Sequence, residues 1–134
     1  MITAVTHATL LVDDPDEALA FYTEVLGFEK HTDVESEEGR WLTVALPDDE
    51  LQLVLMPRDG ERPKRDDVAF VLATDDCRAE HDRLRAADVA FSRDPTVHPY
   101  GVEAGFKDPD GNQLSLLEPA ETVGPTETAG TTGE

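Results

Sequence analysis

The chain has 134 residues, of which 39% are hydrophobic, and this length suits one globular domain with its own core. Its 30 acidic residues outnumber its 11 Lys and Arg residues, so the formal net charge is −19. Such a surface repels phosphate backbones, which excludes nucleic acid as an expected partner.

The acidity is spread along the whole chain, which contains only three lysines. This pattern is typical of proteins from salt-loving organisms, in which concentrated counterions screen the repulsion between carboxylates. The alternative is that some of the acidity serves a cationic ligand, but that role would concentrate carboxylates in one place. The distribution along the chain favours the halophilic interpretation.

The expected location is the cytoplasm, and no membrane contact is expected. No apolar stretch approaches the roughly 18 residues of a membrane span, and the N-terminus lacks the basic start of a signal peptide. The single cysteine, Cys77, excludes an intrachain disulfide and agrees with a reducing compartment.

A strand-like segment that ends in two aspartates occurs twice, at residues 6–14 and 68–76. Each copy is followed by a helix-like segment and then by strand-like segments. A repeat of this length that occurs only twice implies two similar modules whose sheets complete one another. We expect such paired modules to enclose a cleft.

The first module begins with an expected strand at 5–12, and Asp13–Glu17 supplies an N-cap, an early proline and first-turn carboxylates for a helix. The predicted buried stripe of this helix is Ala18, Leu19, Phe21, Tyr22, Val25 and Leu26, with Gly27 ending the turn. Further strands are expected at 28–34, 40–46 and 50–56. The order is therefore strand, helix and three strands.

The polar segment 58–67 is interpreted as a linker, and the second module repeats the order of the first. Its helix, capped by Asp75 and Asp76, is expected to turn Cys77, His81 and Leu84 inward. The segments that follow are a strand at 89–91, a loop at 94–99, a strand at 101–107, a turn at 108–112 and a strand at 113–118. Residues 119–134 are expected to form a disordered acidic tail.

Two segments carry a resemblance to a known family: DDPDEALAFYTEVLGF at 13–28 and GFKDPDGNQLSL at 105–116. They resemble the vicinal oxygen chelate superfamily, which contains glyoxalases, bleomycin-resistance proteins and extradiol dioxygenases. The resemblance implies an α+β fold of two βαβββ modules, which form an open, roughly eight-stranded mixed barrel-like sheet with a central cleft, commonly in a homodimer. We expect one such domain over residues 1–118, with modules at 1–57 and 68–118.

Strand side chains alternate, so the cleft-facing set follows once the helix-facing set is assigned. In the first module Ala8, Leu10 and Val12 suit the helix side. The residues predicted to face the cleft are then His7, Thr9, Leu11, Trp41, Thr43, Ala45, Gln52, Val54, Glu103 and Ser115.

The resemblance also implies four metal-ligand positions, which fall at His7, at Gln52, near Asp67 or Val68, and at Ser115. His7 is a good ligand for a divalent metal and Gln52 an adequate one, but a serine hydroxyl is a poor substitute for a carboxylate. A catalytic site ordinarily needs about three protein ligands. We therefore expect no cofactor, with a divalent metal ion as the alternative; whether Glu118 replaces the missing carboxylate stays open.

Other predicted site residues are groups suited to holding a small molecule. Trp41, flanked by Arg40, is a natural platform for a flat or apolar ligand. The segment 96–103, with His98 and Tyr100, is expected to form a cleft rim. Glu103, inward among apolar neighbours, is a candidate proton acceptor or a partner for a cation.

Three functions remain, and the first is favoured. One is a binding protein of the bleomycin-resistance type that needs no metal, supported by Ser115, Trp41 and Glu103. Another is a metal-dependent lyase, isomerase or dioxygenase, supported by His7 and Gln52. The last is a metal-free enzyme that uses Glu103 or His98 for proton transfer.

Overall fold

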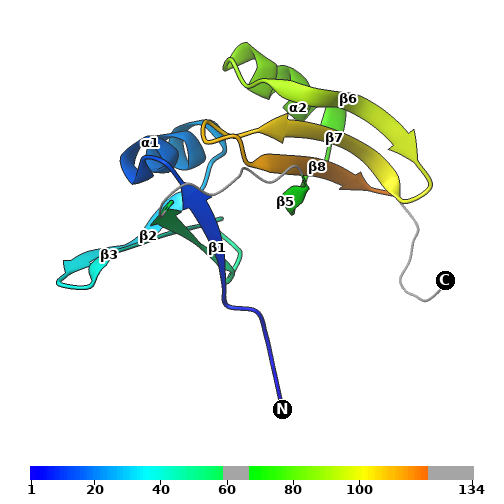
Figure 1. The fold of residues 1–134 in the computed structure, drawn as a ribbon. Coiled ribbons are helices and arrows are strands. Elements are labelled where there is room, and N and C mark those ends of the chain that lie inside the picture. Colours follow the sequence, from blue (N-terminus) through cyan, green and yellow to red (C-terminus); the bar gives the residue numbers. More distant parts are fainter. Residues whose placement is uncertain (59–66, 121–134) are drawn as a thin grey trace. The chain divides into compact units, whose positions relative to one another are not determined.

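The computed structural model describes residues 1–58 and 67–120 of the chain. The predicted linker lies mostly outside these residues, as does nearly all of the predicted acidic tail. The elements, most of which are labelled in Figure 1, are β1 (His7–Val12), α1 (Pro15–Ala20), the π-helix η1 (Phe21–Val25), β2 (Glu29–Ser36), β3 (Gly39–Ala45), β4 (Gln52–Pro57), β5 (Val68–Ala73), α2 (Cys77–Ala86), β6 (Phe91–His98), β7 (Gly101–Lys107) and β8 (Gln113–Pro119). No helix in the described ranges is both long and apolar enough to cross a membrane.

The contacts divide the chain into two compact units. The first contains Met1–Ala69 and the turn Asp108–Asn112, and the second contains Phe70–Lys107 and the residues from Gln113 onward. The first sheet has the strand order β1-β4-β3-β2 and the second has the order β5-β8-β7-β6. The two orders are the same when matched strand by strand, which confirms the duplicated βαβββ modules predicted from the repeat.

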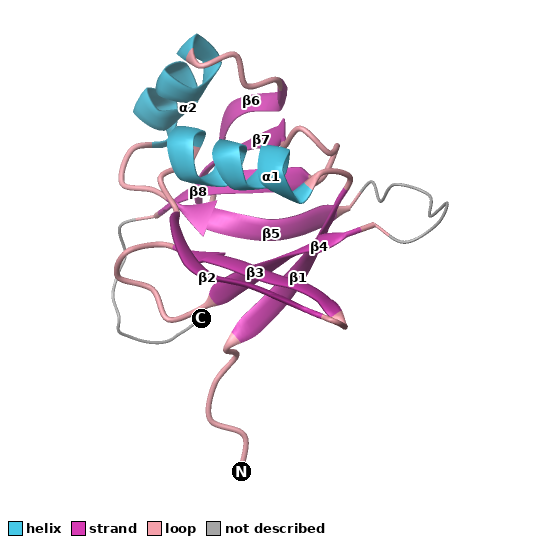
Figure 2. Ribbon diagram, turned by 90° about the vertical axis from the view of Figure 1, so that its left-hand side faces the viewer, coloured by secondary structure: helices cyan, strands magenta, loops and turns pink. Residues whose placement is uncertain are grey.

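The first sheet is mixed, because β1 runs parallel to β4 whereas β3 is antiparallel to both β2 and β4. Figure 2 shows these four strands as neighbouring magenta ribbons. Their alternate residues bury Leu10, Val12, Leu42, Val44, Leu53 and Leu55, and the helical segment adds the buried side chains of Ala18 and Tyr22. Burying each large apolar side chain contributes about 1.5–3 kcal/mol to folding stability. This face therefore forms the hydrophobic core of the unit.

The helix of the first unit begins where the sequence predicts and then changes its winding. The Asp14 Oδ1 atom accepts hydrogen bonds from the backbone N–H groups of Asp16 (3.0 Å) and Glu17 (3.3 Å), and Pro15 occupies the first turn. The next turn is a π-helix, in which the Leu26 N–H donates to the Phe21 carbonyl at 3.2 Å. The π turn was not predicted, because the apolar spacing does not distinguish it from an α turn.

The second helix matches its prediction closely. Asp76 caps it by accepting from the Ala79 N–H at 3.1 Å, and Cys77, His81 and Leu84 are buried as expected. The buried side chains of the second sheet on the same side are Ala104, Phe106, Leu114 and Leu116. Burial raises the pKa of the Cys77 thiol, and the charge of Glu118 raises it further, so this cysteine is a packing residue.

The predicted loop at 94–99 was wrong, because the structure extends β6 without interruption from Phe91 to His98. Pro95 lacks an N–H group, but β6 lies at the edge of its sheet, where that donor is not needed for pairing. The register with β7 shifts between Phe91 and Arg93 and again between Arg93 and Thr96. These irregularities break the alternation that reveals a strand in sequence.

The turn Asp108–Asn112 is structural, as expected, and its centre is a buried carboxylate. Asp108 Oδ1 accepts hydrogen bonds from the backbone N–H groups of Asp110 (2.9 Å) and Asn112 (2.8 Å). Its Oδ2 atom accepts from the Tyr22 hydroxyl at 2.9 Å. The Asn112 side-chain amide also donates to the Leu11 carbonyl at 3.0 Å, so the turn is held to β1 and to η1.

The Asp110 carboxylate of this turn has fewer hydrogen-bond partners than that of Asp108. Its Oδ1 atom accepts from the Asp13 N–H at 2.7 Å, but its buried Oδ2 atom has no hydrogen-bond partner among the described residues. Burial raises the pKa of Asp110, and the nearby charges of Asp108, Asp13 and Glu17 raise it further, against the lowering effect of the Asp13 hydrogen bond. Ionisation of Asp110 therefore lowers the stability of the folded chain.

We predict that Asp110→Asn becomes progressively more stable than the wild type as the pH rises from about 4 to 7. Because the pKa of Asp110 is raised by folding, the folded state binds more protons than the unfolded state. The free energy of unfolding of the wild type therefore falls as the pH rises through the folded pKa of Asp110. The asparagine keeps an oxygen for the Asp13 N–H and removes the charge. Urea unfolding at a series of pH values measures the difference, with the exposed Asp48→Asn as control. A difference that does not change with pH, or that matches the control, contradicts the prediction.

A second prediction concerns Gly101, which opens β7 with φ of +143°. A Cβ atom there would lie 2.1 Å from the Glu118 carbonyl oxygen, so the backbone must shift. Gly39 has a comparable φ of +123° but open space around its missing Cβ. We expect Gly39→Ala to cost about 1–3 kcal/mol of unfolding free energy from strain alone, and Gly101→Ala to cost more. Urea unfolding compares the two, and equal costs would show that the Glu118 contact is unimportant.

Candidate functional site

The face of the first sheet opposite its helix gathers the residues that the alternation predicted. The strand register pairs His7 with Gln52, and pairs both Thr9 and Thr43 with Val54, so these side chains share one face. Trp41 lies two positions from Thr43 on β3 and therefore shares it.

Aromatic and amide groups lie close together on this face. The His7 and Trp41 rings have centroids 5.9 Å apart and are tilted by 50°, and Trp41 is 44% exposed. The buried Thr43 hydroxyl donates to Gln52 Oε1 at 2.9 Å, which orients the amide and leaves its NH₂ group as a donor. The face therefore combines an accessible indole with an oriented hydrogen-bond donor.

The first sheet brings together two of the four metal-ligand positions implied by the resemblance. His7 and Gln52 lie opposite one another on β1 and β4, but Gln52 Oε1 is already the acceptor for Thr43. Among the residues that the structure describes, no group of three or more His, Cys, Asp or Glu side chains is placed to hold a metal ion. One imidazole and one neutral amide fall short of the roughly three protein ligands of a catalytic centre.

The structure places the Glu118 carboxylate at the start of α2. Its Oε1 atom accepts a hydrogen bond from the backbone N–H of Cys77 at 3.0 Å. It thus satisfies a free N–H group in the first turn of α2, where the partial positive charge of the helix favours an anion.

Arg40 makes structural contacts and does not share the face of Trp41. Its Nε and Nη2 atoms donate to the two oxygens of Asp33 at 2.8 and 2.9 Å, and Nη1 donates to Asp16 at 2.8 Å. These hydrogen bonds hold the pKa of Asp33 below its ordinary value. Arg40 therefore links β3 to β2 and to α1, a role that sequence proximity to Trp41 did not reveal.

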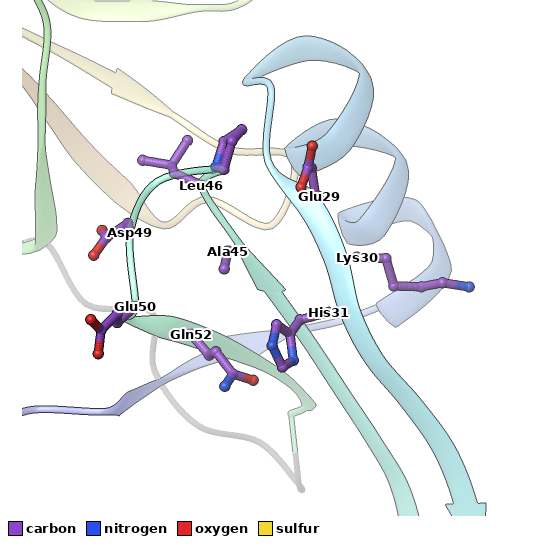
Figure 3. A pocket seen from close by; sticks show the side chains of 9 residues that line it. Glu29, Lys30, His31, Ala45, Leu46, Asp49, Glu50 and Gln52 are labelled. Atoms are coloured by element: carbon purple, nitrogen blue, oxygen red, sulfur yellow. The ribbon is translucent and has the colours of Figure 1, made fainter.

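A pocket of about 360 Å³ lies where β4 begins. Its lining residues are Glu29, Lys30, His31, Ala45, Leu46, Pro47, Asp49, Glu50 and Gln52. Figure 3 shows the His31 ring and the Gln52 amide extending into the same region, whereas Lys30 extends away. Apart from Ala45 and Gln52, this lining was not predicted, because the register shift in β2 between Lys30 and Thr32 cannot be read from the sequence.

The face of the second sheet opposite α2 carries the other predicted residues. The register pairs Glu103 with Thr96, His98 with Gly101, and Gly105 with both Arg93 and Ser115, all on this side. Ser115 is fully buried, and its hydroxyl has no hydrogen-bond partner among the described residues. A buried unsatisfied hydroxyl costs about 1–3 kcal/mol of folding stability, so Ser115 lowers the stability of this unit.

Glu103 is the centre of a cluster at the end of the β6–β7 hairpin. Its Oε1 atom accepts from the Tyr100 hydroxyl at 2.8 Å and lies 3.9 Å from His98 Nε2, and its Oε2 atom lies 3.7 Å from Arg93 Nη2. The His98 and Tyr100 rings are stacked, with centroids 4.8 Å apart and planes 3° apart. Arg93 was not predicted in this cluster, because the register shifts of β6 on either side of Arg93 interrupt the alternation that would show which face of the sheet it lies on.

The Glu103 hydrogen bond raises the pKa of Tyr100, since the carboxylate stabilises the neutral phenol and its charge opposes ionisation. We predict that Glu103→Gln lowers the pKa of Tyr100 towards the ordinary value of about 10. Absorbance at 295 nm against pH measures this, because the chain has only two tyrosines and Tyr22 is buried. Tyr100→Phe should remove the transition, and an unchanged midpoint in Glu103→Gln would show that the contact does not form in solution.

Comparisons with known proteins agree with this architecture. The family model described as "Glyoxalase/Bleomycin resistance protein/Dioxygenase superfamily" matches residues 4–116. TnmS3, an antibiotic binding protein from Streptomyces sp. CB03234, is 35% identical, with a TM-score of 0.80 over 89% of this chain and 98% of that one. YurT of Bacillus subtilis (strain 168), an uncharacterized protein, is 32% identical over 82% of this chain and 94% of its own length. Glutathione transferase FosA of Serratia marcescens is 29% identical over 87% of this chain and 81% of its own. The chain therefore belongs to the glyoxalase/bleomycin resistance protein/dioxygenase superfamily.

Proposed function

We propose that this protein binds a small organic molecule non-covalently on the strand faces opposite its helices and sequesters it without a catalytic metal. The observation that carries the proposal is the 35% identity, over almost the whole length of both chains, to an antibiotic binding protein. The accessible Trp41 indole on the first sheet supplies a surface suited to such a ligand.

The chemistry of the first face supports binding of a partly apolar compound. Small-molecule sites are mainly apolar and aromatic, with a few placed polar groups that orient the ligand. Here Trp41 supplies the aromatic surface, Val34 and Met56 add exposed apolar surface, and the Gln52 NH₂ group is an oriented donor.

The donor chemistry supports a role that does not depend on a metal. The positions implied by the resemblance offer an imidazole at His7 and an amide at Gln52 in the first unit, and the described part of the chain contains no group of three or more His, Cys, Asp or Glu side chains placed to hold a metal ion. Non-covalent sequestration needs only the hydrogen-bonding and apolar groups that these residues provide.

An alternative function is a metal-dependent lyase, isomerase or dioxygenase. The similarity to a glutathione transferase favours an enzyme of some kind. The placement of His7 directly opposite Gln52 favours the use of a metal, because both occupy metal-ligand positions implied by the resemblance. A metal-free enzyme that uses Glu103 or His98 for proton transfer is the remaining candidate, since these groups lie within 3.9 Å of each other.

The binding proposal predicts a saturable change in Trp41 fluorescence when the protein is titrated with a panel of aromatic antibiotics in the presence of EDTA. Trp41 is the sole tryptophan, so the signal reports on this face. We expect Gln52→Ala to weaken binding by about 5- to 50-fold, because one oriented hydrogen bond is lost. Glu24→Gln, an exposed change on η1, should leave the affinity unchanged.

Metal analysis of protein purified without a tag tests the alternative directly. A near-stoichiometric divalent metal that is lost in His7→Ala would contradict metal-free sequestration and favour the metal-dependent enzyme. A panel that produces no saturable response from Trp41 would contradict the assignment of this face to ligand binding.

A further inference from the structure

We propose that the cluster of His98, Tyr100 and Glu103 on the β6–β7 hairpin binds a planar aromatic molecule that carries an N–H or O–H donor and no negative charge. This inference rests on the proposed binding function and names the class of ligand. It concerns the second unit, whereas the Trp41 face belongs to the first.

The stacked rings supply a flat surface. His98 and Tyr100 are parallel to within 3°, at a centroid distance of 4.8 Å, and Tyr100 is 53% exposed. A further planar ring can therefore stack against this pair, and such contacts are worth about 0.5–1.5 kcal/mol beyond the area that they bury. The hydrogen bond from the Tyr100 hydroxyl to Glu103 holds the phenol in place, so little side-chain freedom is lost on binding.

Glu103 supplies the polar anchor. Its Oε1 atom is occupied by Tyr100, but its Oε2 atom lies 3.7 Å from Arg93 Nη2, which is longer than a hydrogen bond. The Glu103 side chain is only 17% exposed, so its charge is less screened than that of a surface carboxylate. A donor on the ligand edge can therefore form a charge-assisted hydrogen bond with Oε2.

The charges around the hairpin disfavour binding of an anionic ligand. The positive charge of Arg93 is offset by the carboxylate of Glu103 at 3.7 Å, so the cluster carries no excess positive charge to attract a phosphonate or a carboxylate. The net charge of −19 also repels anions and attracts cations over the whole surface. Neutral and cationic aromatic compounds are therefore favoured over anionic ones of the same shape.

The test uses the full chain at fixed ionic strength with two planar probes, the cationic dye proflavine and the anion anthracene-2-carboxylate. Fluorescence anisotropy should show saturable proflavine binding that is at least tenfold tighter than binding of the anion. Tyr100→Leu and Glu103→Gln should each weaken proflavine binding by about tenfold or more, because they remove the stack and the charged acceptor. Tyr100→Phe keeps the ring and should weaken it less.

Glu38→Gln in the β2–β3 turn is the matched control, since it removes one carboxylate charge from an exposed position of the first unit. If it weakens proflavine binding as much as Glu103→Gln does, the dye is attracted by net charge alone and the inference fails. Equal affinity for the anion, or no saturable proflavine binding, also overturns it. Circular dichroism verifies the folding of each variant, and the conservative Tyr100→Phe and Glu103→Gln keep the test valid if Tyr100→Leu unfolds.

The outcome separates this inference from the proposed function. An antibiotic that changes Trp41 fluorescence with the same affinity in the wild type, Tyr100→Leu and Glu103→Gln would support sequestration and refute a role for the hairpin.

Discussion

The arrangement of both units depends on one constraint: each sheet is covered by helix on a single face, and strand side chains alternate between faces. In the first unit this buries Leu42 and Val44 in the core and places Trp41 and Thr43 on the other side. In the second unit Ala104 and Phe106 are buried, and Glu103 lies on the opposite face. The hydrophobic requirement of the core thus decides which polar and aromatic groups are available for a ligand.

The excess of carboxylates shapes how charge is handled inside the structure. With 30 acidic and 11 basic residues, most carboxylates cannot find a Lys or Arg partner. Some are instead held by neutral donors: Asp108 by two backbone N–H groups and the Tyr22 hydroxyl, and Glu118 by the Cys77 N–H. Hydrogen bonds of this kind stabilise an anion without a cation. Arg40, which bridges Asp33 and Asp16, shows the contrasting use of a scarce guanidinium.

Membership of the superfamily explains the scaffold but leaves the chemistry to individual side chains, because one fold hosts unrelated functions. The relatives illustrate this range, since one is named as an antibiotic binding protein and another as a glutathione transferase. In this chain a serine stands at 115 and an amide at 52, and neither brings a negative charge to a cation. The two strand faces instead carry aromatic and hydrogen-bonding groups such as Trp41, Gln52 and Tyr100, which support the binding proposal.

The sequence by itself determined the two-module architecture, the helix caps at Asp14 and Asp76, and the faces of Trp41, Thr43, Gln52 and Glu103, because alternation and capping are local patterns. It did not reveal the full length of β6, the π turn of η1 or the pocket beside Gln52, since bulges interrupt alternation and an apolar stripe does not distinguish winding. Only the tertiary structure decided the partners: Arg40 with Asp33 and Asp16, Glu118 with the start of α2, and Arg93 with Glu103. These residues come close together only because strands pair and helices pack against them. Local sequence patterns such as alternation and capping do not show that pairing and packing.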